Sequence, residues 1–199
     1  MPLRIVEPTA DIRRALVDEL SLRARATAFR TERLRAARPA ALGLAAPHPV
    51  FHLGLDEVGR PGCLERVAMT GWRYFVTEGN AVVAAAEALA SSPHGPLLGT
   101  QTNEGPFVAG SVAALSRAEA LPQVDGGHYA LGLLRVPALY VVALWLRDEQ
   151  PRGAHDLFVP VAPAPGPLQA GVAIAAEAFE QALVEVKAAK AEGGDERTN

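Results

Sequence analysis

The sequence is poor in several features that would assign it to a particular class of protein. It has one cysteine, Cys63, so it cannot form an internal disulfide, and this is usual in the reducing cytoplasm. Its longest uncharged apolar run, residues 136–146, is much shorter than the roughly 20 residues that cross a bilayer as a helix. The first residues lack the apolar core and cleavage site of a signal peptide. We therefore expect a cytoplasmic protein without a membrane segment.

Lysine is almost absent, because it occurs only at Lys187 and Lys190 among the 19 basic residues. Such a preference for arginine is typical of a GC-rich genome, so arginine clusters carry less meaning here. The net charge is −3, and no overall field attracts nucleic acid or anionic lipid. Residues 23–38 are rich in arginine and could contact an acidic partner or nucleic acid. Without interleaved aromatic residues, a solvated helix face is the better interpretation, and nucleic acid is not an expected partner.

The motifs of common enzyme classes are also missing. The sequence contains no Walker loop, no Gly-x-Gly-x-x-Gly after a strand and no Gly-x-Ser-x-Gly elbow. His48 and His52 have metal-ligand spacing only on a helix, whereas on a strand they stand ~13 Å apart. Cys63 lies near Arg60 and Arg66, which could activate a thiol, but an ordinary buried cysteine is favoured. We expect no catalytic residues, no metal and no cofactor.

The composition suits a globular domain with a substantial core, since 49% of the residues are hydrophobic and 21% are charged. We predict one domain over residues 1–191, followed by a disordered tail at 192–199. Within the domain we expect an N-terminal helix at 9–38, a Pro- and Ala-rich linker at 39–49, and a sheet with its helices at 50–191.

Alternating apolar residues predict several strands. Trp72, Tyr74 and Val76 alternate with Arg73 and its neighbours, which is typical of a strand. Residues 81–90 form either the second strand of a hairpin or an alanine-rich helix capped by Asn80, and we favour the hairpin. A strand is also expected at 157–161, and helical spacing predicts helices at 106–121 and 168–191.

The most apolar stretch of the chain is residues 128–149. Both alternating faces are apolar, which predicts two strands buried on both sides in the middle of the sheet, with Pro137 at the bend between them. A wall of a ligand cavity is the alternative interpretation of the same residues.

The expected order of elements is α-ββ-α-βββ-α. This order predicts an α+β fold, an antiparallel sheet of about five to six strands with long terminal helices and one central helix packed on it. It resembles the order of profilin-like and roadblock-like domains and, more loosely, of PAS and GAF domains. The resemblance lies in the order of the elements and in no sequence motif, so it does not imply a function.

One polar segment, residues 99–106, is the best candidate for a binding site. It places Thr100, Thr102, Asn103 and Glu104 directly before a predicted helix, where free N–H groups and the helix dipole favour an anion or polar ligand. The alternative is that Thr102 or Asn103 caps the helix and the other residues form a hydrated turn.

Arg135 is the second candidate, because it interrupts an apolar strand and a buried guanidinium needs an acceptor. That acceptor could be the carboxylate or phosphate of a ligand, or Glu87 or Glu119 in a structural ion pair.

These observations favour a non-enzymatic cytoplasmic module that binds another protein or itself, with a small anionic ligand near residues 99–106. Self-association is expected because the first helix is longer than its apolar stripe. The alternative function is a small-molecule sensor or an enzyme, with a pocket between the central sheet and the helix that begins near Pro106.

Overall fold

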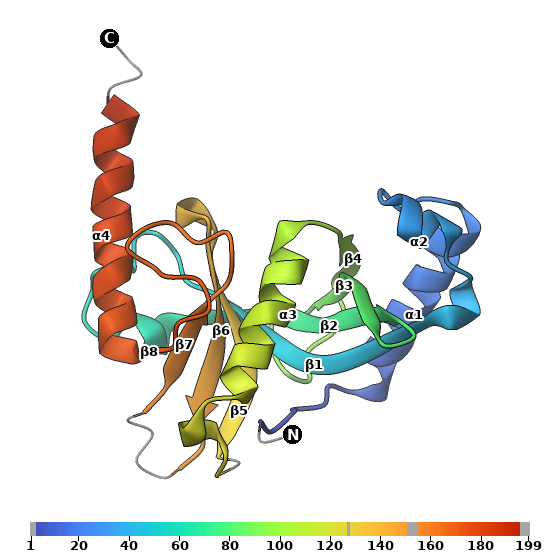
Figure 1. Cartoon of the computed structure of the whole chain (residues 1–199), viewed down its shortest axis with the longest axis horizontal. Coiled ribbons are helices and arrows are strands. Elements are labelled where there is room, and N and C mark those ends of the chain that lie inside the picture. Colours follow the sequence, from blue (N-terminus) through green and yellow to red (C-terminus); the bar gives the residue numbers. More distant parts are fainter. Residues whose placement is uncertain (1–2, 127, 151–154, 196–199) are drawn as a thin grey trace.

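The structure is a computed structural model that describes residues 3–126, 128–150 and 155–195. It shows an α+β fold in which four α-helices accompany one large sheet of eight strands (Figure 1). The helices are α1 (Ala10–Arg25), α2 (Glu32–Ala36), α3 (Pro106–Glu119) and α4 (Ala176–Asp195). The strands are β1 (Leu42–His52), β2 (Ala68–Glu78), β3 (Ala81–Leu89), β4 (Gly99–Asn103), β5 (Tyr129–Val136), β6 (Val141–Asp148), β7 (Leu157–Pro160) and β8 (Ile174–Ala175).

The sheet consists of two antiparallel halves that meet in the middle. Its strand order is β4-β3-β2-β1-β5-β6-β7-β8, and every neighbouring pair is antiparallel except β1 and β5, which run parallel. The predicted α+β class is therefore right, whereas the prediction of five to six antiparallel strands is wrong in its details. Each half consists of strands that follow one another in the chain. Helix α3 connects β4, at the edge of the first half, to β5, which pairs with β1 and so joins the two halves.

The hairpin and the central strands agree with the sequence. Residues 81–89 form strand β3 rather than a helix, and Gly79, with φ of 58°, makes the tight turn after β2. The stretch from 129 to 148 forms β5 and β6, with a bend at Pro137. Leu133 and Leu134 point to opposite faces, and both are fully buried. The prediction that this stretch lies in the middle of the sheet is confirmed.

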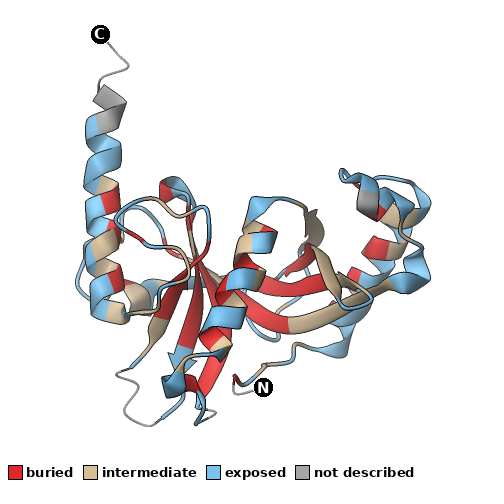
Figure 2. Ribbon diagram, in the orientation of Figure 1, coloured by how far each residue is buried: buried red, intermediate tan, exposed pale blue. Residues whose placement is uncertain are grey.

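The helices cover both faces of the sheet. Helix α3 packs on one face, against a cluster that includes Leu131 and Leu133. Helix α4 packs against Leu134 and Phe158 on the opposite face, and α1 covers the same face at the far end of the sheet, against Trp72. Figure 2 shows buried residues along the strands and on the sheet-facing sides of the helices. Helix α3 therefore covers strands of both halves of the sheet.

The predicted N-terminal helix at 9–38 is too long. Helix α1 ends at Arg25, Thr27 has a positive φ of 50°, and the chain bends before the short helix α2. The bend lets Phe29 and Leu34 enter the core cluster under α1, where both are buried. Burial of two large apolar side chains outweighs the helical continuity that local propensity favours.

Four other boundaries also differ from the prediction. From Leu42 onward the expected linker is strand β1, which keeps its place beside β2 through a bulge near residues 45–48. The expected loop at 99–106 is strand β4 up to Asn103. Helix α4 begins at Ala176 rather than near residue 168, since Ile174 and Ala175 pair with β7. It continues to Asp195, so the tail predicted from 192 is helical at 192–195, and residues 196–199 lie outside the described residues.

Candidate functional site

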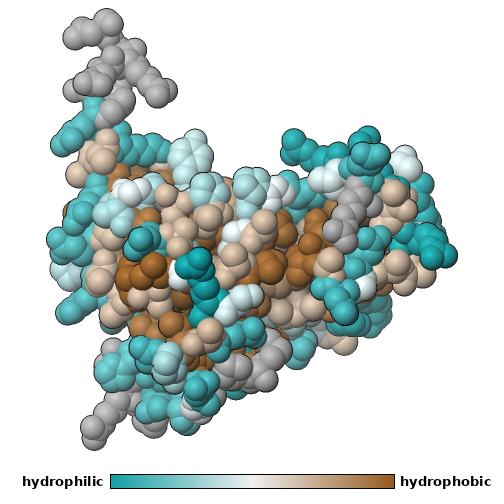
Figure 3. All heavy atoms as spheres, viewed as in Figure 1, coloured by the Kyte–Doolittle hydropathy of each residue, from teal (hydrophilic) through white to brown (hydrophobic). Residues whose placement is uncertain are grey.

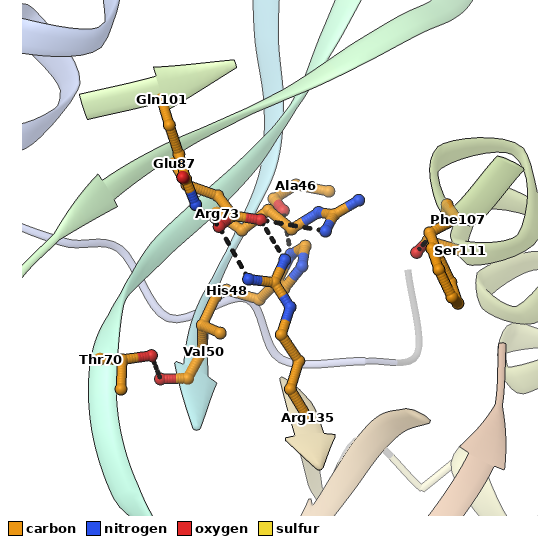
Figure 4. A network of polar contacts seen from close by, with 10 residues as sticks. All are labelled: Ala46, His48, Val50, Thr70, Arg73, Glu87, Gln101, Phe107, Ser111 and Arg135. Carbon is orange, nitrogen blue, oxygen red and sulfur yellow. Dashed lines mark hydrogen bonds and ion pairs between the residues drawn. The ribbon is translucent and has the colours of Figure 1, made fainter. Parts of the chain in front are cut away.

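A row of polar side chains crosses four neighbouring strands under α3. Gln101 of β4 lies opposite Glu87 of β3, Glu87 opposite Arg73 of β2, and Arg73 opposite His48 of β1. Directly paired residues point to the same face of a sheet, so the register brings these four side chains together. Arg135 reaches the same cluster from β5 (Figure 4).

Glu87 is the centre of this cluster and is only 2% exposed. Its Oε1 accepts a hydrogen bond from Arg73 Nη1 at 3.0 Å, and its Oε2 accepts from Gln101 Nε2 at 2.7 Å. Arg135 donates to both oxygens, through Nη1 to Oε2 at 2.9 Å and through Nη2 to Oε1. Burial raises the pKa of Glu87. The hydrogen bonds and charge of Arg135, together with Arg73 and Gln101, lower this pKa by more, so the net shift is downward. The carboxylate is therefore ionised, and its acceptor sites are filled.

Arg73 is buried but only partly paired. The residue is 2% exposed, and Nη1 donates a hydrogen bond to Glu87. Nε and Nη2 have no hydrogen-bond partner within residues 3–126, 128–150 and 155–195. Burial lowers the pKa of Arg73 to about 10, with Glu87 opposing that effect and Arg135 adding to it. At neutral pH the guanidinium is still charged, so one carboxylate faces two cations, the buried Arg73 and the partly buried Arg135.

His48 does not change this excess positive charge. Its Nδ1 lies 2.8 Å from the carbonyl oxygen of Ala46, a contact that requires Nδ1–H to donate. Burial, and then the charge of Arg73, lower the pKa of His48 to about 4. Burial also lowers the pKa of His52, which lies opposite Arg135 in the register. Both histidines favour the neutral form at pH 7, so the cluster keeps its excess positive charge.

A cavity of about 470 Å³ opens beside this cluster, between the sheet, the first turn of α3 and the turn from β5 to β6. This volume is in the range of small-molecule sites. In Figure 4 the far end of the Arg73 guanidinium points away from Glu87, toward the side where Phe107 and Ser111 of α3 lie. The lining consists of Arg30, Arg73, Thr102, Asn103, Glu104, Gly105, Pro106, Phe107, Val108, Arg135, Pro137, Tyr140, Val141 and Val142.

Four of the five predicted site residues line this one cavity. They are Thr102, Asn103, Glu104 and Arg135, whereas Thr100 is not part of the lining. Strand alternation turns the side chain of Asn103 toward the α3 face together with Gln101, and that of Thr102 toward the opposite face. Whether these residues bind a ligand stays a prediction, but the structure brings them together with Arg73.

Glu104 has a structural partner. Its carboxylate accepts hydrogen bonds from the backbone N–H groups of Arg30, at 2.9 Å, and Thr31, at 2.7 Å. Burial raises the pKa of Glu104, and the bonds from Thr31 and Arg30 lower it by more. Glu104 therefore joins the segment before α2 to the mouth of the cavity. The residue before α3 is Gly105, without a side-chain capping bond, so the alternative that Thr102 or Asn103 caps this helix is wrong.

Arg135 forms an ion pair with Glu87, one of the two partners expected from the sequence, and whether it also binds a ligand stays a prediction. The sequence interpretation missed Arg73, because one arginine in an alternating strand is compatible with a solvent-facing side. The available signal was the combination of Arg73, Glu87 and Arg135 in three strands that are otherwise strongly apolar. Only the register shows that the three meet.

Other candidate centres give no comparable arrangement. Burial, with Glu180 adding to it, raises the pKa of the Cys63 thiol, which is the opposite of activation. Within the described part of the chain, no three His, Cys, Asp or Glu side chains are grouped to hold a metal ion. No helix among the described residues is long and apolar enough to cross a bilayer.

The charge arrangement predicts very different effects of two substitutions on the free energy of unfolding. Glu87→Gln leaves the buried Arg73 and the partly buried Arg135 without this counter-ion, and we expect it to lower the free energy of unfolding by about 3–5 kcal/mol. Arg73→Met leaves the Arg135–Glu87 pair and removes the excess cation, so a change within about 1 kcal/mol, of either sign, is expected. Urea denaturation measures both, with the exposed Glu177→Gln as a control. A loss from Arg73→Met as large as that from Glu87→Gln would mean that Arg73 is a structural residue.

His48 predicts a dependence of stability on pH. Its pKa is about 4 in the folded chain and 6.5 ordinarily, so between these values the unfolded chain binds the proton more readily. The free energy of unfolding should therefore fall as the pH drops from 6.5 to 4, on the order of 3 kcal/mol from this group. His48→Asn keeps an N–H for Ala46 and should flatten this decline, whereas the exposed His94→Asn should not. Equal slopes in wild type and His48→Asn would refute the assignment.

Comparison with known proteins found no relative of this chain. No protein-family model matches the chain, and neither a curated protein nor a solved structure shows significant similarity to it. The likeness to profilin-like and roadblock-like domains thus depends on element order alone, and the functional argument depends on the cavity.

Proposed function

We propose that the protein is a binding module that holds a small anionic molecule in the cavity between the sheet and the first turn of α3. The observation that carries this proposal is Arg73, which lines the cavity and whose buried guanidinium has two nitrogens without a partner among the described residues. A buried cation without full compensation costs stability, and a bound anion would remove that cost.

The electrostatics of the lining support an anion over a cation or a neutral ligand. Three arginines border the cavity, and the nearby carboxylates are Glu87 and Glu104. Glu87 is saturated by its donors, and Glu104 is held by two backbone N–H groups. Inside a region of low dielectric constant the remaining positive charge acts more strongly than it would on the surface.

The chemistry of the lining favours binding over conversion. Its polar groups are mainly guanidinium and amide donors, and its carboxylate, Glu104, already accepts two hydrogen bonds. A general base needs a free lone pair within reach of a substrate proton, and a nucleophile needs such a base beside it. We therefore favour a cytoplasmic binding module over the alternative of an enzyme using the same pocket.

Anion binding can be tested by thermal shift at constant ionic strength, against carboxylates, phosphonates and sulfonates with matched neutral alcohols. We expect at least one anion class to raise Tm by several degrees, since a ligand at about 100 times its Kd adds about 2.7 kcal/mol. Arg73→Met should abolish that shift because it removes the free donors.

Arg38→Met is the matched control, since Arg38 is exposed and does not line the cavity. Calorimetric titration of the best anion into all three proteins then gives the dissociation constants. An anion that stabilises wild type and Arg73→Met equally binds elsewhere, and this result would remove the basis of the proposal.

Self-association remains a separate expectation. Its original basis was a first helix longer than its apolar stripe, and that basis is lost because α1 ends at Arg25. An apolar groove between α3 and β3 is the remaining support, and Figure 3 shows apolar side chains gathered beside α3 on this face. Light scattering after size-exclusion chromatography should show a dimer or larger species. A monomer at high concentration would contradict this expectation.

A further inference from the structure

The unpaired part of Arg73 has a defined shape. Nη1 is occupied by Glu87, whereas Nε and Nη2 are the two nitrogens without a partner in the described part of the chain. In a guanidinium group the N–H bonds of Nε and Nη2 project side by side from one edge, in the plane of the group. This edge matches the spacing of two carboxylate oxygens and forms two parallel hydrogen bonds with them.

The charge of the cluster fits a single negative charge. Arg73 and Arg135 together carry two positive charges, and the ionised Glu87 between them carries one negative charge. The surplus of one positive charge is neutralised by a monoanion. A dianion would leave a buried negative charge in excess, which costs free energy for the same reason.

The rest of the lining is largely apolar. Its apolar residues include Phe107, Val108, Pro137, Tyr140, Val141 and Val142, from α3, the β5–β6 turn and β6. Tyr140 is 73% exposed at the turn, and its positive φ of 55° is uncommon for an aromatic residue. A ligand whose anionic end meets Arg73 therefore has an apolar wall, rather than further donors, around most of its remaining surface.

We infer that the ligand class of this cavity is a monocarboxylate with an apolar group, held side-on by Nε and Nη2 of Arg73. Its hydrocarbon part lies against the Phe107 and Val142 side of the cavity. Asn103, on the same face at the end of β4, is placed to offer its amide to the carboxylate. This inference depends on the proposed function, since it names the kind of anion that the module takes.

A matched set of four ligands tests this inference by isothermal titration calorimetry at fixed pH and ionic strength. Hexanoate has the carboxylate and the apolar chain, acetate lacks the chain, hexanol lacks the charge, and hexylphosphonate replaces the carboxylate. We expect hexanoate to bind at least tenfold more tightly than each of the others. Within a series of linear carboxylates, each methylene that becomes buried should add about fourfold in affinity.

Three variants connect the binding to the named groups. Arg73→Lys keeps the charge but loses the two-pronged edge, so hexanoate affinity should fall at least tenfold. Val142→Ser should weaken hexanoate and leave acetate unchanged. Thr100→Val should change neither, because Thr100 does not line the cavity and strand alternation directs its side chain to the opposite face. Circular dichroism and Tm establish that each variant is folded, and the Arg135–Glu87 pair remains in all three.

The outcomes separate this inference from the function on which it depends. If hexylphosphonate binds as tightly as hexanoate and its binding is lost in Arg73→Lys, the anion-binding function stands and the carboxylate class is wrong. If acetate matches hexanoate, the apolar subsite is wrong. If no ligand of the set or of the wider anion panel shows binding that Arg73 substitutions remove, both proposals fail.

Discussion

One buried carboxylate shared between two guanidinium groups, one buried and one partly buried, is the interaction on which the site depends. Glu87 bonds to Arg73, Arg135 and Gln101 at once, and these partners come from strands on both sides of the sheet's centre. The parallel contact of β1 with β5 brings Arg135 within reach of a residue two strands beyond β1. The Arg135–Glu87 ion pair therefore connects the two halves of the sheet across the parallel contact of β1 with β5.

The same arrangement leaves part of Arg73 prepared for a ligand. Removing a guanidinium from water is unfavourable, and among the residues that the structure describes only one of the three Arg73 nitrogens has a partner, Glu87. The surrounding strands keep the side chain in place, because His48, Glu87 and Gln101 are fixed in the same register row. A binding group that is held in position before its ligand arrives loses little entropy on binding.

Local sequence patterns predicted much of the framework. Alternation identified β2 and β5–β6, the turn residues after Glu78 favoured the β3 hairpin, and α3 begins at Pro106 as expected. Arg135 was recognised because a charge in an apolar strand needs a partner, and Glu87 was one of the partners expected. The pattern failed where long-range burial outweighs local preference, as at Phe29, where the chain bends to bury an aromatic ring, and at residues 42–49, where a bulge accommodates prolines in β1.

The sequence by itself determined the α+β class, the apolar centre of the sheet and the need of Arg135 for a carboxylate, because these follow from spacing and burial along one segment. Only the tertiary structure decided that Arg73 lies beside Glu87 and lines the cavity between the sheet and α3. Nothing in its own strand distinguishes this residue. The physical reason is register: the partners of a strand residue lie in other strands, and no periodicity within one strand specifies which residues will lie opposite.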